Sequence, residues 1–190
     1  MKPLSTLIFG LFSLGLNASI NLPTSFNTNF EQIITNDKGK SIKYKGDVYF
    51  QNVKERIADD RGIEQSYTRS LFKWNYSMPT KKEVCTDGIQ LTVVDHDLEQ
   101  ISNYLIDEGI DLESILNVAT QITSKDYKAI YKEVEYLITL DEKNQLKKII
   151  YVDNLDNNVK IIFSKMFYNK KLDAKLLECH APQSYDVIKG

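Results

Sequence analysis

The side chains best suited to bind a metal or attack a substrate are two histidines and two cysteines. His96 stands between Asp95 and Asp97, and His180 directly follows Cys179. Zinc sites in proteins need three or four converging ligands. Alternation along a strand would send the two aspartates to the face opposite His96, and a tight turn would leave both carboxylates in water. The spacing therefore does not favour a metal site.

Signatures of enzymes that bind phosphate or hydrolyse substrates are missing from the sequence. It contains no Gly-x-Ser-x-Gly elbow, no His-Glu-x-x-His pair and no phosphate loop. The formal net charge is −2, so no basic field attracts nucleic acid. We expect a protein that is not an enzyme, with no catalytic residues, no metal, no cofactor and no nucleic-acid partner.

The other chemically notable pair is Cys85 with the distant Cys179, the only cysteines of the chain. In an oxidising compartment they could form a disulfide. Two separate buried thiols are the alternative, and the sequence does not decide between them because the distance between the two positions depends on the fold.

The N-terminus has the pattern of a cleaved signal peptide. Lys2 precedes an apolar run from Leu4 to Leu16, and Ala18 and Ser19 offer small residues for a signal peptidase. The run is short for a bilayer of roughly 30 Å, which disfavours the alternative of a retained anchor. We expect residues 1–18 to be a signal, cut after Ala18 or Ser19, and residues 19–190 to be one soluble domain.

Most of the remaining chain is patterned as strands. Ser41 to Phe50 alternates apolar and polar residues after a turn signal at Asn36–Gly39. Val134 to Leu140 repeats the two-residue period. Val159 to Phe167 is apolar in both registers, which predicts a strand covered on both faces. The turn signals between these segments predict a continuous antiparallel meander of eight to eleven strands.

One segment has a helical period instead. Asp111 could cap a helix whose apolar face is formed by Leu112, Ile115, Leu116, Ala119 and Ile122. A large sheet curled around one such helix encloses an apolar interior.

The segment Gln51–Thr68 is unusually rich in charge, with Lys54, Glu55, Arg56, Asp59, Asp60, Arg61 and Glu64. We expect a solvated extension of a strand connection. A loop that docks a partner is the alternative.

Several segments, taken in order, resemble the LolA family of periplasmic lipoprotein carriers. The similarity covers essentially all of the chain after residue 18. The similar segments are Ser25–Gln32, Gly39-Lys40, Gly46–Phe50, Leu71–Trp74, Pro79, Asp87-Gly88, Asp97–Gln100 and Ala181–Ile188.

The resemblance implies a mainly β fold, a half-open antiparallel β-barrel with a short α-helical lid over an apolar cavity. It implies a periplasmic monomer that takes outer-membrane lipoproteins from an inner-membrane ABC exporter and carries them to the outer membrane, with an outer-membrane receptor as a further partner. Only Ile20 to Thr24 precedes the first strand, so the family's N-terminal lid helix should be truncated or absent. Arg69 has no proline beside it, unlike the basic pair of the family.

A carrier of this kind must shield acyl chains, which cost on the order of 10 kcal/mol each to expose to water at about 0.8 kcal/mol per methylene. We place Phe72 and Trp74 at the cavity mouth. The full set of expected wall and lid residues is Phe26, Phe30, Tyr44, Phe50, Phe72, Trp74, Ile101, Leu116 and Ile138. A periplasmic lipid- or glycolipid-binding module of the same fold is the alternative function.

Overall fold

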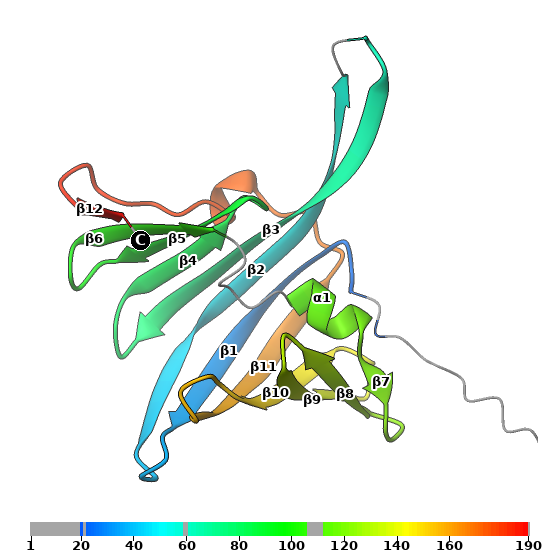
Figure 1. Ribbon diagram of the computed structural model, residues 1–190, viewed down its shortest axis with the longest axis vertical. Coiled ribbons are helices and arrows are strands. Elements are labelled where there is room, and N and C mark those ends of the chain that lie inside the picture. Colours follow the sequence, from blue (N-terminus) through cyan, green and yellow to red (C-terminus); the bar gives the residue numbers. More distant parts are fainter. Residues whose placement is uncertain (1–19, 21, 59–60, 106–111, 190) are drawn as a thin grey trace, which may run out of the picture.

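A single twelve-stranded sheet dominates the computed structural model, which describes residue 20 and residues 22–58, 61–105 and 112–189 (Figure 1). The strand order is β12-β6-β5-β4-β3-β2-β1-β11-β10-β9-β8-β7. The strands are β1 (Ser25–Thr35), β2 (Ser41–Ala58), β3 (Glu64–Met78), β4 (Lys82–Thr86), β5 (Gln90–Asp95), β6 (Gln100–Leu105), β7 (Thr120–Gln121), β8 (Asp126–Tyr131), β9 (Val134–Leu140), β10 (Leu146–Val152), β11 (Asn158–Tyr168) and β12 (Asp186–Lys189).

The sheet curls without closing, because β12 and β7 form its two ends and do not pair with each other (Figure 1). This confirms the predicted half-open barrel. The predicted continuous meander is wrong in two places: β1 pairs with β11, far along the chain, and β12 lies parallel to β6. The short strands β7 and β12 bring the count to twelve rather than eight to eleven. Hairpin signals are local, so they do not reveal such long-range pairings.

Local sequence explains the central hairpin of β1 and β2. In β2 the apolar residues of the two-residue period become more buried towards the middle of the sheet, ending in Val48 and Phe50, both at most 2% exposed. The turn closes because the Asn36 side chain accepts the backbone N–H groups of Lys38 and Lys40. Gly39 supplies the positive φ of 76° that this turn requires.

A β-bulge explains why β11 is apolar in both registers. Val159, Ile161 and Phe163 are buried on the concave face. The register against β1 then shifts, and Lys165 takes a positive φ of 54°. Beyond the shift Met166 packs on the core while Phe167 is 56% exposed. The prediction that both faces of this strand are covered is therefore wrong, since the apolar residues change register within the strand.

The helix α1 (Leu112–Asn117) is shorter than the helical period suggested. Leu112, Ile115 and Leu116 are buried against the concave face of the sheet. The chain then turns into β7, so Ile122 lies outside the helix and is 57% exposed, contrary to the prediction. The expected cap, Asp111, lies outside the described residues.

The charged segment forms strands rather than a loop. Beyond Gln51, where pairing with β1 ends, β2 continues antiparallel to β3 as a two-stranded projection (Figure 1). We call residues Asn52–Ala58 with Glu64–Ser70 the arm. Its backbone is hydrogen-bonded within the hairpin, which corrects the expected solvated connection to an ordered β-hairpin.

The convex face of β3 to β5 is covered by the segment between β11 and β12, which includes the 3-10 turn η2 (Ala174–Leu176). A disulfide between Cys85 and Cys179 attaches this segment to β4, so the cysteines are paired. The Lys73 ammonium donates to the Glu178 carbonyl at 2.7 Å, which adds a second attachment.

No helix within the described ranges is long and apolar enough to cross a membrane. Residue 20 and residues 22–24, the described part before β1, contain no helix. The expected signal, residues 1–18, lies outside the described residues.

Candidate functional site: an aromatic cavity under a short helix

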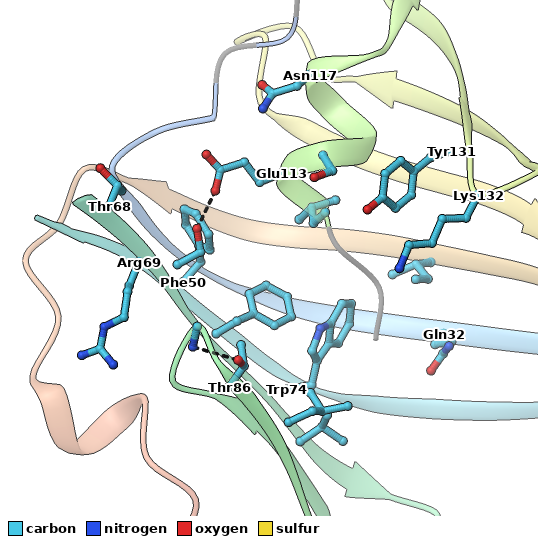
Figure 2. A pocket seen from close by; sticks show the side chains of 18 of the residues that line it. Gln32, Phe50, Thr68, Arg69, Trp74, Thr86, Glu113, Asn117, Tyr131 and Lys132 are labelled. Atoms are coloured by element: carbon cyan, nitrogen blue, oxygen red, sulfur yellow. Dashed lines mark hydrogen bonds between the residues drawn. The ribbon is translucent and has the colours of Figure 1, made fainter. Parts of the chain in front are cut away.

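A cavity of about 540 Å³ lies between the concave face of the sheet and α1. Figure 2 shows its wall, with residues from β2 and β3 on one side and from α1 and the β8–β9 turn on the other. The lining residues are Gln32, Phe50, Thr68, Arg69, Ser70, Phe72, Trp74, Tyr76, Val84, Thr86, Gly88, Leu91, Leu112, Glu113, Ser114, Asn117, Tyr131, Lys132 and Ile161.

Aromatic side chains form the sheet side of this cavity. The two-residue period of β3 puts Phe72, Trp74 and Tyr76 on one face, and Phe50 of β2 lies opposite Phe72. The ring centroids of Phe72 and Trp74 are 5.5 Å apart, and those of Phe50 and Phe72 are 6.2 Å apart, both in edge-to-face geometry. Trp74 also meets Phe30 edge-on at 4.6 Å. These contacts hold a rigid apolar wall.

The far end of the wall carries a buried hydroxyl. Tyr76 donates to the Gln32 side-chain oxygen at 3.2 Å. Burial, and to a lesser extent the neighbouring Tyr44, raises the pKa of Tyr76 well above its usual range. Tyr76 is therefore neutral at any physiological pH and adds no charge to the cavity wall.

Polar groups gather where α1 meets the sheet. The Ser70 hydroxyl donates to the Glu113 carboxylate of α1, the dashed line that ends at Glu113 in Figure 2. It also contacts the Asn52 side-chain oxygen of β2. Arg69 instead pairs with Glu55 on the neighbouring strand, and its side chain packs over Gly88. A direct side-chain hydrogen bond between β3 and the helix thus runs from Ser70 to Glu113.

The structure distributes the predicted wall residues over three places. Phe50, Phe72 and Trp74 line the cavity. Phe26, Phe30, Leu116 and Ile138 are buried in the core next to it, and Tyr44 contacts Tyr76 with ring centroids 5.8 Å apart. Ile101 lies on the convex face. Val93 pairs with Val84, which lines the cavity on the concave face, so the next residue, Val94, points to the convex face together with its partner Ile101.

Several lining residues were not among those predicted. Tyr76 extends the period of Phe72 and Trp74, so continuing the pattern by one step would have found it. Val84, Leu91 and Tyr131 carry no such local signal. Val84 and Leu91 reach the cavity because the pairings of β3 with β4 and of β4 with β5 align them. Tyr131 reaches it from the end of β8.

The residues considered for metal binding form a different kind of cluster, on the convex face. Glu83, Cys85 and Cys179 place one possible ligand atom each within 4.8 Å of one another, but both sulfurs are already joined. Glu83 contacts the Lys73 ammonium at 2.9 Å and accepts the His180 backbone N–H at 2.9 Å.

Burial pushes the pKa of Glu83 upward, yet the His180 N–H and the Lys73 ammonium outweigh it and hold the pKa below its ordinary value. His96 completes the cluster, with its Nε2 3.5 Å from Glu83 and its Nδ1 3.1 Å from the Tyr185 hydroxyl. The arrangement ties the C-terminal segment to the sheet.

Comparison with known proteins gives a consistent picture. Residues 68–179 match the family model described as outer membrane lipoprotein carrier protein LolA. A protein of Campylobacter jejuni named outer-membrane lipoprotein carrier protein is 29% identical, over 94% of this chain and 92% of its own. One of the same name from Wolinella succinogenes is 27% identical, over 95% and 94%.

Among solved structures, a LolA superfamily protein from Nitrosomonas europaea is similar with a TM-score of 0.46 and 13% identity, covering 84% of this chain and 93% of its own. The family model spans more than half of the sequence, including β4 to β11, and it contains most of the residues that line the cavity. The chain belongs to the family of the outer membrane lipoprotein carrier protein LolA.

Proposed function

We propose that this protein is a periplasmic carrier that shields the acyl chains of lipoproteins, receives them from an inner-membrane exporter and delivers them to the outer membrane. The observation that carries the proposal is the cavity of about 540 Å³ with an aromatic wall, covered by a helix of only six residues. Family membership and the names of the two relatives support a carrier role.

The physical argument concerns the exposed acyl chain. Each methylene taken out of water contributes about 0.8 kcal/mol, so a carrier needs apolar surface and no reactive group. Phe50, Phe72 and Trp74 supply that surface at the cavity. We assign the base of the binding surface to Phe26, Phe30, Leu116 and Ile138, with Tyr44 beside its far end.

Release is the second requirement of a carrier. The helix α1 buries Leu112, Ile115 and Leu116 on the same core that faces the cavity. Since these three side chains are at most 6% exposed in the empty protein, cargo that enters beneath α1 must displace part of this packing, and that cost offsets part of the cargo affinity. The binding is therefore moderate enough for transfer without ATP.

Native mass spectrometry of the protein isolated from the periplasm of its own bacterium tests the proposal. The expected result is a population bound to intact lipoproteins. Recovery of phospholipid or glycolipid alone would overturn the carrier proposal and favour a lipid-binding module of the same fold. N-terminal sequencing of the same sample should begin at Ser19 or Ile20 if residues 1–18 or 1–19 are removed on export.

A depletion experiment tests the transport step separately. Lowering the amount of this protein should leave outer-membrane lipoproteins in the inner-membrane fraction. Unchanged fractionation of lipoproteins in depleted cells would contradict the proposed place between exporter and outer membrane.

A further inference from the structure

The arm has two different faces, and one of them continues the cavity wall. Beyond the pair Phe50 and Phe72, the next residues on the same face of β2 and β3 are the pair Asn52 and Ser70. Further pairs follow on this face: Lys54 with Thr68, and Arg56 with Ser66. The surface thus changes from aromatic to polar within one step of the two-residue period.

The opposite face of the arm has another character. It carries Val53, Ile57 and Tyr67, together with Glu55, which contacts both Tyr67 and Arg69. In a hairpin that only extends into solvent, the two faces would be expected to carry similar residues. The cation of this opposite face, Arg69, is paired with Glu55. Lys54 on the cavity side has no such ion pair with a described residue.

The polar face begins where the cavity ends. Thr68 and Ser70 line the cavity. Ser70 is hydrogen-bonded to Glu113 of α1 (Figure 2) and to Asn52. A chain leaving the cavity between β3 and α1 therefore meets this face first. From Asn52 to Ala58 the strand extends by about 20 Å, enough to lie along roughly six residues of an extended peptide.

The charge of this face is positive on balance. Lys54 forms no ion pair with any described residue. Arg56 has one partner, Glu64 at 3.9 Å, and both of these side chains are more than two thirds exposed, so the pair is weak. The described residues on the cavity side of the arm thus include two cations, Lys54 and Arg56, and one carboxylate, Glu64. The whole chain, in contrast, carries a net charge of −2.

We propose that the cavity side of the arm binds the acidic, extended peptide that follows the acylated end of a cargo lipoprotein. The inference rests on the proposed function, because the peptide leaves at this mouth only when the acyl chains occupy the cavity. Lys54 and Arg56 attract the carboxylates of the peptide, while Ser66 and Thr68 offer hydrogen bonds to its backbone and side chains. The arm selects among cargo proteins whose acyl groups are identical.

Synthetic lipopeptides test this directly. Two probes share the same brominated acyl chains and differ in a six-residue linker, one rich in Asp and Ser and the other rich in Asn and Ser. Binding is followed by quenching of Trp74, the only tryptophan of the chain. We expect the acidic probe to bind about threefold to tenfold more tightly at low salt, with the preference lost at high salt.

The variant K54Q/R56Q should lose the preference and bind the neutral probe as the wild type does. Its matched control, K143Q/K147Q, removes two exposed lysines from the β9–β10 hairpin and should keep the preference. Equal binding of both probes by the wild type overturns the proposed role of the arm. Failure of both probes to bind at all overturns the proposed function itself, so the two failures are distinguishable.

Discussion

Replacing Phe72 with glutamate tests the assignment of the cavity most sharply. Phe72 lines the cavity, is only half-buried, and touches Phe50 and Trp74 edge-on. In the empty protein a carboxylate at this position can remain solvated through the open cavity. We therefore expect Phe72→Glu to fold, with a loss of about 1–3 kcal/mol from the missing aromatic packing.

Cargo binding should suffer more than folding. An acyl chain in the cavity would remove water from the new carboxylate, which must then be buried charged or take up a proton. The cost of protonating the carboxylate is the upper limit of this penalty. At about 1.4 kcal/mol per pH unit, protonating a glutamate with a pKa near 4.3 at pH 7 costs about 3.7 kcal/mol. We expect affinity for an acyl chain to fall by about two orders of magnitude at pH 7, and by much less at pH 5.

The chain contains its own reporter for this measurement. Trp74 is the only tryptophan, and it stands in the cavity wall next to Phe72. Titration with a brominated acyl chain should quench its emission as the cavity fills, and the midpoint gives the dissociation constant. Urea unfolding of the same variant measures the stability change independently.

The matched control is Phe167→Glu. Phe167 is 56% exposed beyond the bulge of β11 and does not line the cavity. This variant should bind as the wild type does. Wild-type affinity in Phe72→Glu at pH 7, or an equal loss in both variants, would refute the placement of the acyl chain against Phe72.

Three further predictions follow from the fold. Replacing Cys85 and Cys179 with serine removes a disulfide between residues 94 positions apart, which should lower the free energy of unfolding by about 4 kcal/mol. A reducing agent should lower the stability of the wild type to the same value and leave the variant unchanged. In Gly46→Ala the new methyl group would clash with the Asn75 carbonyl oxygen. The variant should lose about 2 kcal/mol or more of its free energy of unfolding, which lowers the melting temperature by several degrees. An unchanged melting temperature would contradict this close approach. Glu83 has a pKa below the ordinary 4.5, so its charge stabilises the fold above that pH, and this contribution is lost as the pH falls through the folded-state pKa. Urea unfolding of Glu83→Gln should therefore show a smaller loss of stability on acidification than the wild type. Parallel stability curves of the two proteins would count against the assignment.

Much of the strand pattern could be predicted because it depends on neighbours in the sequence. The alternation in β2 and β9 and the Asn36–Gly39 turn are decided by residues only a few positions apart. The failures came where distant parts meet. The bulge at Lys165 changes the face of β11 through its pairing with β1, and Ile122 leaves the helix because β7 must pair with β8.

For the candidate site, the sequence by itself determined the aromatic wall, since Phe50, Phe72 and Trp74 share the two-residue period of their own strands. Only the tertiary structure decided which neighbours face them. Strand register brings Val84 and Leu91 to the cavity and puts Ile101 on the convex face, and the pairing of β2 with β3 past the sheet turns a charged segment into an arm with two distinct faces. The physical reason is that periodicity fixes only that alternate residues lie on opposite faces, while the pairing of distant strands decides what each face meets.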